Sequence, residues 1–128
     1  MRLLLDTHTF LWWVADAPQI PARARQAIAQ PRNECLVSLA SCWELAIKLS
    51  LGKIEISGTL ERFIPSQLSA NGFRELPIET RHAARVARLP FHHRDPFDRL
   101  LVAQALEEDL TIVSADPVFR RYGVNRIW

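Results

Sequence analysis

Several short stretches of the chain have the length and composition of strands. The first, Leu3 to Leu5, is an unbroken apolar run that ends at the carboxylate of Asp6. A run that is apolar at every position fits a central strand of a parallel sheet, because both faces of such a strand are covered. The chain further predicts strands over residues 34–37, 73–76 and 111–113, and an edge strand over residues 124–127.

The segments between these stretches carry helix signals. Residues 7–15 form an apolar-rich helix, and Pro21 stands at the first turn of a second helix that stops before Pro31. The other predicted helices run from a cap at Ser38 or Ser41 to Gly52, over residues 59–70 with a disturbance at Pro65, from a cap at Thr80 to before Pro90, from Phe97 to about Asp109, and as a short turn from Asp116-Pro117. Strands that alternate with helices predict an α/β fold with a parallel sheet covered on both faces.

The composition is that of one ordinary globular domain. The chain has 128 residues, of which 48% are hydrophobic and 23% charged, so residues 1–128 are expected to form a single domain. Two cysteines at a spacing that fits no metal or redox motif indicate reduced thiols. The apolar runs are too short to span a bilayer, and the first residues do not resemble a signal peptide, so a soluble, cytoplasmic protein is expected.

Four carboxylates stand near predicted strand exits or helix starts, and they come from four separate parts of the chain. They are Asp6, Glu44, Asp98 and Asp116. Ligands of parallel sheets bind beyond the carboxyl ends of the strands, so these side chains are candidates for one site. If they converge, a cation must offset their repulsion, and hard oxygen ligands suit Mg²⁺ or Mn²⁺. Such a set is typical of metal-assisted phosphoryl chemistry.

Each of these acids also has a structural explanation. Asp6 and Asp116 could cap the helices that follow them, and Glu44 stands four residues before Lys48, the favourable order for an ion pair. Asp95 and Asp98 form an arrangement like a capping box, with Asp95 at the cap and Asp98 at the third helical position. The functional interpretation therefore depends on the whole set of acids.

Other motifs and side chains give weaker indications of function. No glycine-rich phosphate loop and no nucleophile elbow is present. His8 has low weight as a substrate contact, and the pair at residues 92–93 has no spacing that indicates a metal site. Trp12, Trp13 and Trp43 are expected to be mostly core, with one of the adjacent pair near the surface as a possible partner contact.

The net charge of +2 is not that of a protein that coats nucleic acid, but basic residues gather between positions 81 and 99. On the predicted helix, Arg81, Arg85 and Arg88 share one stripe. With Arg99 they are candidate RNA contacts, and a solvated face is the alternative explanation.

Four segments together resemble a known family. They are the start Leu-Leu-Leu-Asp-Thr-His, Ser-Cys-Trp-Glu-Leu at 41–45, Asp-Pro-Phe-Asp-Arg-Leu-Leu-Val-Ala-Gln-Ala at 95–105, and Val-Ser-Ala-Asp at 113–116. In this order they resemble a PIN domain, most closely the VapC-type toxins of bacterial type II toxin–antitoxin systems. The resemblance spans essentially the whole chain, and the segment at 95–99 is its most specific part.

The resemblance implies a three-layer α/β/α fold with a central parallel sheet of four to five strands. It implies an Mg²⁺- or Mn²⁺-dependent endoribonuclease with catalytic Asp6, Glu44, Asp98 and Asp116. Of these, Asp6, Asp98 and Asp116 would hold the metal, with Thr7, Ser114 and Asp95 in support. It also implies an RNA substrate, a VapB-type antitoxin and a homodimer.

Two other functions stay open at this point. A phosphatase of the haloacid-dehalogenase type needs a second Asp two residues after the first, and this chain has His8 there. A non-catalytic binding module would use the acids mainly as caps. Three or more carboxylates within metal-bridging distance would exclude that module.

Overall fold

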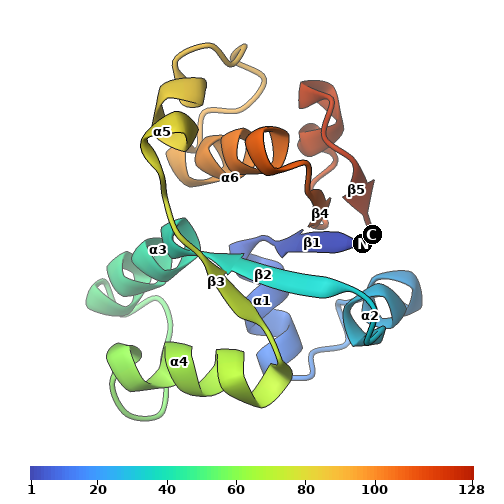
Figure 1. Ribbon diagram of the computed structural model, residues 1–128. Helices are drawn as coiled ribbons and strands as arrows, with labels where there is room; N and C mark the ends of the chain where they lie inside the picture. Colours follow the sequence, from blue (N-terminus) through green and yellow to red (C-terminus); the bar gives the residue numbers. More distant parts are fainter.

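The chain folds as a parallel sheet between two layers of helices (Figure 1). The structure is a computed structural model and describes all residues from Met1 to Trp128. Its strands are β1 (Arg2–Leu5), β2 (Glu34–Ser38), β3 (Arg74–Leu76), β4 (Thr111–Val113) and β5 (Arg126–Ile127). Its helices are α1 (Thr7–Val14), α2 (Ala22–Ala29), α3 (Leu39–Ser50), α4 (Leu60–Asn71), α5 (Thr80–Val86), α6 (Pro96–Glu108) and the 3₁₀ helix η1 (Pro117–Tyr122).

The sheet has the strand order β3-β2-β1-β4-β5, and every pair is parallel. This confirms the predicted α/β class, the parallel sheet and the edge position of the last strand. The predicted strand positions agree with the observed ones to within two residues at each end. β1 lies at the centre because its three leucines are all fully buried, which only a strand covered on both faces allows.

Successive residues of β1 point into different cores. Leu4 packs in a cluster of 14 buried residues with α6 and η1, whereas Leu3 and Leu5 pack in a cluster of 13 with α1, α2 and α4. The two clusters are the interfaces of a three-layer sandwich, with α5 and α6 on one side of the sheet in Figure 1 and α1, α2 and α4 on the other. No helix is both long and apolar enough to cross a membrane.

Two of the predicted helix details were wrong. The α5 cap is Glu79 and not Thr80, because a capping box joins Glu79 and His82. Helix α4 runs without interruption through Pro65, for which the sequence indicated a disturbance. Pro65 is exposed, so the carbonyl that loses its helical partner faces solvent, where the loss costs little.

Candidate functional site

The candidate site lies where the strand order reverses. Strand β2 pairs with one edge of β1, and β4, which comes later in the chain, pairs with the other edge. At such a switch point the loops after neighbouring strands turn apart and leave room for a ligand. Asp6 follows β1 and Ser114 follows β4, and the backbone N–H of Asp6 donates to the carbonyl of Val113 at 3.2 Å.

Asp6 both caps a helix and joins two strand ends. Its Oδ1 accepts from the backbone N–H of Thr9 at 2.9 Å, which makes Asp6 the N-cap of α1. Its Oδ2 accepts from the Ser114 hydroxyl at 2.5 Å. That hydroxyl oxygen in turn accepts from the N–H of Asp116 at 3.0 Å. The proposed supporting residue Ser114 therefore links the loops that carry two of the acids.

Glu44 enters the site from α3 and is held by Thr7. The Thr7 hydroxyl lies 2.6 Å from Glu44 Oε1 and 2.9 Å from the Ser41 hydroxyl. The other Glu44 oxygen is 3.3 Å from the Lys48 ammonium, so the anticipated ion pair forms. Glu44 is only 9% exposed, however, so it is not the solvated surface acid that the pairing alone would predict.

Asp95 and Asp98 have different roles although they share one helix start. Asp95 is the N-cap of α6, because its Oδ1 accepts from the N–H groups of Phe97 at 2.8 Å and Asp98 at 3.2 Å. In a reciprocal box Asp98 would accept from the N–H of Asp95, but that N–H donates to His93 Nδ1 at 3.2 Å. The Asp98 carboxylate is therefore left for the site.

The charge environment of Asp98 is unusual. Burial, followed by the carboxylates of Asp95 and Asp6, raises the pKa of Asp98 from 3.8 to about 7, and Glu44 adds to this. His93 acts in the opposite direction. Asp6, Glu44 and Asp98 therefore lie close enough to act on one another electrostatically, although they come from three different elements.

Asp116 completes the group at the end of β4. Its Oδ1 accepts from the N–H of Val118 at 2.9 Å, so it caps η1 as the Asp-Pro pair predicted. Its Oδ2 is 3.5 Å from His93 Nε2, and the same ring nitrogen is 2.9 Å from Asp98 Oδ2. His93 therefore lies between the two carboxylates.

His93 was not predicted as a site residue. The histidine pair at residues 92–93 has no ligand spacing, but the structure places one ligand atom each of His93, Asp98 and Asp116 within 4.8 Å of one another. Two carboxylates and one imidazole thus meet at this distance, while Asp6 and Glu44 act on Asp98 through charge. No local pattern marks His93, because the loop before α6 brings it to the site.

The donor set fits a hard divalent cation. Oxygen atoms of carboxylates predominate, and the two cysteines lie elsewhere. After burial, the carboxylates of Asp95, Asp6 and Glu44 all raise the pKa of Asp98, so negative charges gather at a position that needs positive charge for balance. A bound cation would supply that balance, so the residues present fit Mg²⁺ or Mn²⁺.

Arg99 does not face this site as the RNA contact that the sequence suggested. It is 6% exposed, and its guanidinium donates to the carbonyls of Pro90 at 2.9 Å and Val86 at 3.2 Å. It also donates to the Tyr122 hydroxyl at 3.3 Å. Its donors are used within the protein, so Arg99 holds the loop between α5 and α6.

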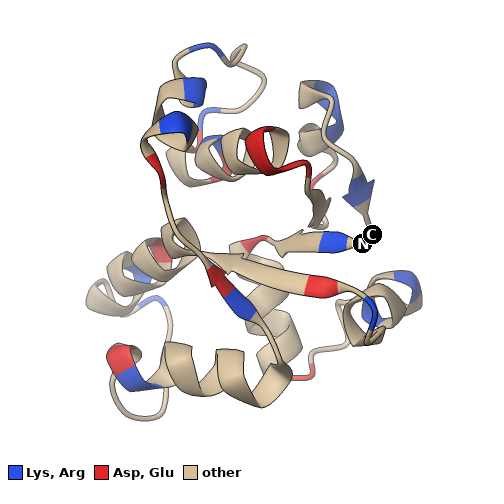
Figure 2. Cartoon of the chain, in the orientation of Figure 1, with Lys and Arg blue, Asp and Glu red and all other residues tan.

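The arginines of α5 are paired with acids. Figure 2 marks the basic residues of α5 in blue and the acidic residues near the end of α6 in red. Arg85 lies 3.1 Å and Arg88 3.7 Å from the same Glu107 oxygen, and Arg81 pairs with Glu79 and Glu108. An RNA phosphate would have to compete with these carboxylates, and RNA contacts of Arg81, Arg85 and Arg88 stay a prediction.

A second group of ligand-type side chains joins α5 to α6. His82 is fully buried, with Nδ1 accepting from the N–H of Glu79 at 3.0 Å and Nε2 3.1 Å from Glu108. Glu79, His82 and Glu108 have the spacing of a metal site. Arg81 already supplies the positive charge here, so the group is accounted for as a capping and ion-pair network.

The tryptophans differ from the expectation. Trp12 and Trp13 are both half-buried against the core, so neither is the exposed member of the pair. Trp43 is 59% exposed and packs edge-on against Phe97 with 5.1 Å between ring centroids. It is therefore a surface residue and not a core one, although it neighbours Glu44 in sequence.

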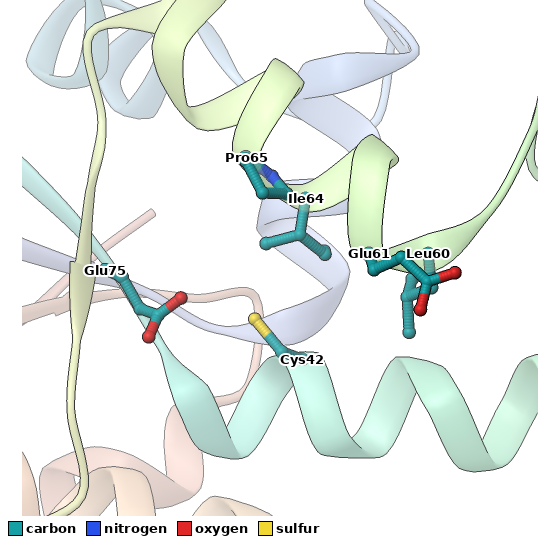
Figure 3. A pocket seen from close by; sticks show the side chains of 6 residues that line it. All are labelled: Cys42, Leu60, Glu61, Ile64, Pro65 and Glu75. Carbon is teal, nitrogen blue, oxygen red and sulfur yellow. The ribbon is translucent and has the colours of Figure 1, made fainter.

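Cys42 lines a separate pocket of about 320 Å³ between α3 and α4 (Figure 3). Glu75 of β3 points toward the thiol from one side, and Ile64 of α4 lies on the other. Burial, with Glu75 adding to it, raises the pKa of Cys42 to about 11, so the thiol keeps its proton at neutral pH. A protonated thiol is a poor nucleophile, so these surroundings do not activate Cys42 for attack.

Known proteins share this architecture. A model of the PIN domain matches residues 3–125, which is almost the whole chain. The chain belongs to the PIN domain family. This PIN domain is 31% identical over 121 residues to Ribonuclease VapC22 of Mycobacterium tuberculosis, and the alignment covers 94% of this chain and 91% of that protein.

Solved structures of low sequence identity confirm the PIN fold. The VapBC2 complex of Rickettsia felis, crystallised with a promoter DNA fragment, matches with a TM-score of 0.74 at 16% identity and covers 100% of this chain and 99% of its own. FitAcB of Neisseria gonorrhoeae matches with a TM-score of 0.68 at 22% identity and covers 98% of this chain and 96% of its own. The three-layer fold and the parallel sheet that the sequence resemblance implied are therefore confirmed.

Proposed function

We propose that this PIN domain is a divalent-metal-dependent endoribonuclease and the toxin of a type II toxin–antitoxin pair. The main support is that acids from β1, α3, α6 and the loop after β4 gather at one end of the sheet in a chain related to Ribonuclease VapC22. The catalytic set is Asp6, Glu44, Asp98 and Asp116, the metal ligands are Asp6, Asp98 and Asp116, and the supporting residues are Thr7, Ser114 and Asp95.

A Mg²⁺ or Mn²⁺ ion held by Asp6, Asp98 and Asp116 would supply a Lewis acid to activate water and offset charge on the scissile phosphate. The protein contributes a fixed constellation around it. Ser114 and Thr9 hold both oxygens of Asp6, and the Thr7 hydroxyl orients Glu44. Such fixed groups stabilise a developing charge without reorganising during the reaction. In-line attack by water leaves a 5′-phosphate and a 3′-hydroxyl.

Single-stranded or looped RNA is the proposed substrate, because its backbone can bend into a small acidic cleft. An RNA substrate also agrees with a cytoplasmic location. The proposed partners are a VapB-type antitoxin and a second copy of the chain. Structures titled as VapBC and FitAB complexes support an antitoxin, since their toxin subunits have the fold seen here.

The decisive experiment measures cleavage of mixed RNA by the purified protein. We expect cleavage with Mg²⁺ or Mn²⁺, none with excess chelator, and none from the Asp6→Asn or Asp98→Asn variants. Activity that survives chelation and both substitutions would overturn the proposal. In cells, expression should arrest growth, Asp6→Asn should relieve the arrest, and the neighbouring open reading frame should encode a protein that copurifies. A harmless protein that copurifies with nothing and cleaves no RNA would indicate a non-catalytic module.

A further inference from the structure

The loop that carries His93 is fixed by buried polar groups that the chemistry described so far does not use. The Tyr122 hydroxyl accepts from the backbone N–H groups of His92 at 3.1 Å and His93 at 2.8 Å. Arg99 donates to the same hydroxyl and to the carbonyl of Pro90 in the loop. The backbone at His93 is therefore attached to η1 and to α6, the two elements that carry Asp116 and Asp98.

The contacts of the imidazole define which nitrogen carries the proton. Nδ1 accepts a hydrogen bond from the N–H of Asp95 at 3.2 Å, so the proton that the ring donates lies on Nε2. Nε2 then carries the proton, and it lies 2.9 Å from Asp98 Oδ2 and 3.5 Å from Asp116 Oδ2. A ring nitrogen that holds a proton is a hydrogen-bond donor and not a metal ligand.

From these contacts, we propose that His93 is a positioning residue of the nuclease site and that the Tyr122 hydroxyl is its anchor. The N–H at Nε2 donates to Asp98 and faces Asp116. This one donor holds in fixed orientations two carboxylates that would otherwise repel one another. The inference rests on the proposed function for its meaning, but the tautomer and the anchoring can be tested without it.

The first test is independent of catalysis. Long-range ¹H–¹⁵N correlation spectra of the metal-free protein at about pH 8, well above the usual pKa of histidine, report which ring nitrogens carry protons. The His93 signals are identified by their loss in His93→Gln. We expect a proton on Nε2, the nitrogen that faces Asp98. A bare Nε2, which could not donate to Asp98, would overturn the proposal.

The second test compares variants with matched changes. His93→Leu removes the donor, whereas His93→Gln keeps an N–H near the position of Nε2. Removing such an outer contact weakens metal binding or activity by about 10–100-fold. We therefore expect His93→Leu to weaken Mn²⁺ binding and to lower kcat by this amount, and His93→Gln to recover most of the loss. Arg94→Gln is the control, because Arg94 is exposed in the same loop.

Tyr122→Phe removes only the anchoring hydroxyl. We expect it to lower kcat and Mn²⁺ affinity in the same direction as His93→Leu, and to broaden or shift the His93 ring signals. Melting curves show that each variant is folded. Wild-type Mn²⁺ affinity in His93→Leu, or equal losses in His93→Leu and Arg94→Gln, would overturn the proposal. A wild-type protein that cleaves no RNA would refute the proposed function, while the tautomer and the Mn²⁺ affinities would still decide the role of His93.

Discussion

Replacing Asp98 by Asn tests the site through the free energy of unfolding as well as through activity. Burial and the carboxylates of Asp95 and Asp6 raise the pKa of Asp98 from 3.8 to about 7 in the folded protein. An acid with a raised pKa binds its proton more tightly in the folded than in the unfolded chain. The free energy of unfolding therefore falls as the pH rises from about 4 to about 7, and it stays lower above that range.

The size of this effect follows from the shift. A difference of about 3 pKa units corresponds to about 4 kcal/mol at most, and partial solvent exposure reduces this to about 1–3 kcal/mol. Asn has the shape of Asp without the charge. Asp98→Asn should therefore stabilise the metal-free protein by about 1–3 kcal/mol near pH 8, and by almost nothing near pH 4, where Asp98 already carries its proton.

The assay is urea unfolding followed by tryptophan fluorescence in the presence of a chelator, repeated across this pH range. Asp16→Asn is the matched control, because Asp16 pairs with Arg25 at the surface at 2.9 Å and has no carboxylate neighbours of this kind. Its effect should be small. The reasoning is refuted if Asp98→Asn gives the same stability change at pH 4 and pH 8, or if it destabilises the protein at pH 8.

Three further outcomes follow from the contacts described. Asp95→Ala should lower the free energy of unfolding by about 0.5–2 kcal/mol as a lost N-cap, whereas Asp95→Asn should keep most of the stability, as urea unfolding will show. Arg99→Leu should cost about 3 kcal/mol by leaving loop carbonyls without their donor, while Arg88→Ala, at an exposed position just after α5, should change stability by less than about 0.5 kcal/mol in the same assay. Adding Mn²⁺ should raise the melting temperature of the wild-type protein and leave that of Asp98→Asn nearly unchanged, and an equal rise in both would place the metal elsewhere.

Local signals in the sequence were sufficient for the fold. The apolar run before Asp6 marks the central strand, and the Asp-Pro pairs at 95 and 116 mark helix starts, because a buried strand and an N-cap each need particular residues at particular places. The cap at Glu79 was missed because it depends on His82 to complete it. Apart from this cap, features that depend on a few neighbouring residues were predicted from the sequence.

The site was predictable only in part. Strand exits located Asp6 and Asp116, since parallel strands bring their carboxyl ends to one edge of the sheet. Arg99 and His93 could not be assigned in this way. The loop between α5 and α6 covers the Arg99 guanidinium with backbone carbonyls, and it brings the His93 ring to two carboxylates. Their roles depend on tertiary contacts that no spacing records.

The pairing of β1 with β4 also has a consequence for the order of folding. The contact between Asp6 and Ser114 joins positions 108 residues apart, and β1 reaches its second neighbour only when β4 is in place. Contacts this distant in sequence form late, since a long loop must close before they can stabilise anything. A nascent chain therefore has no complete acidic centre until β4 and Asp116 have emerged from the ribosome. The emergence of this last acid, and not that of the first catalytic residue, sets the moment at which the site can form.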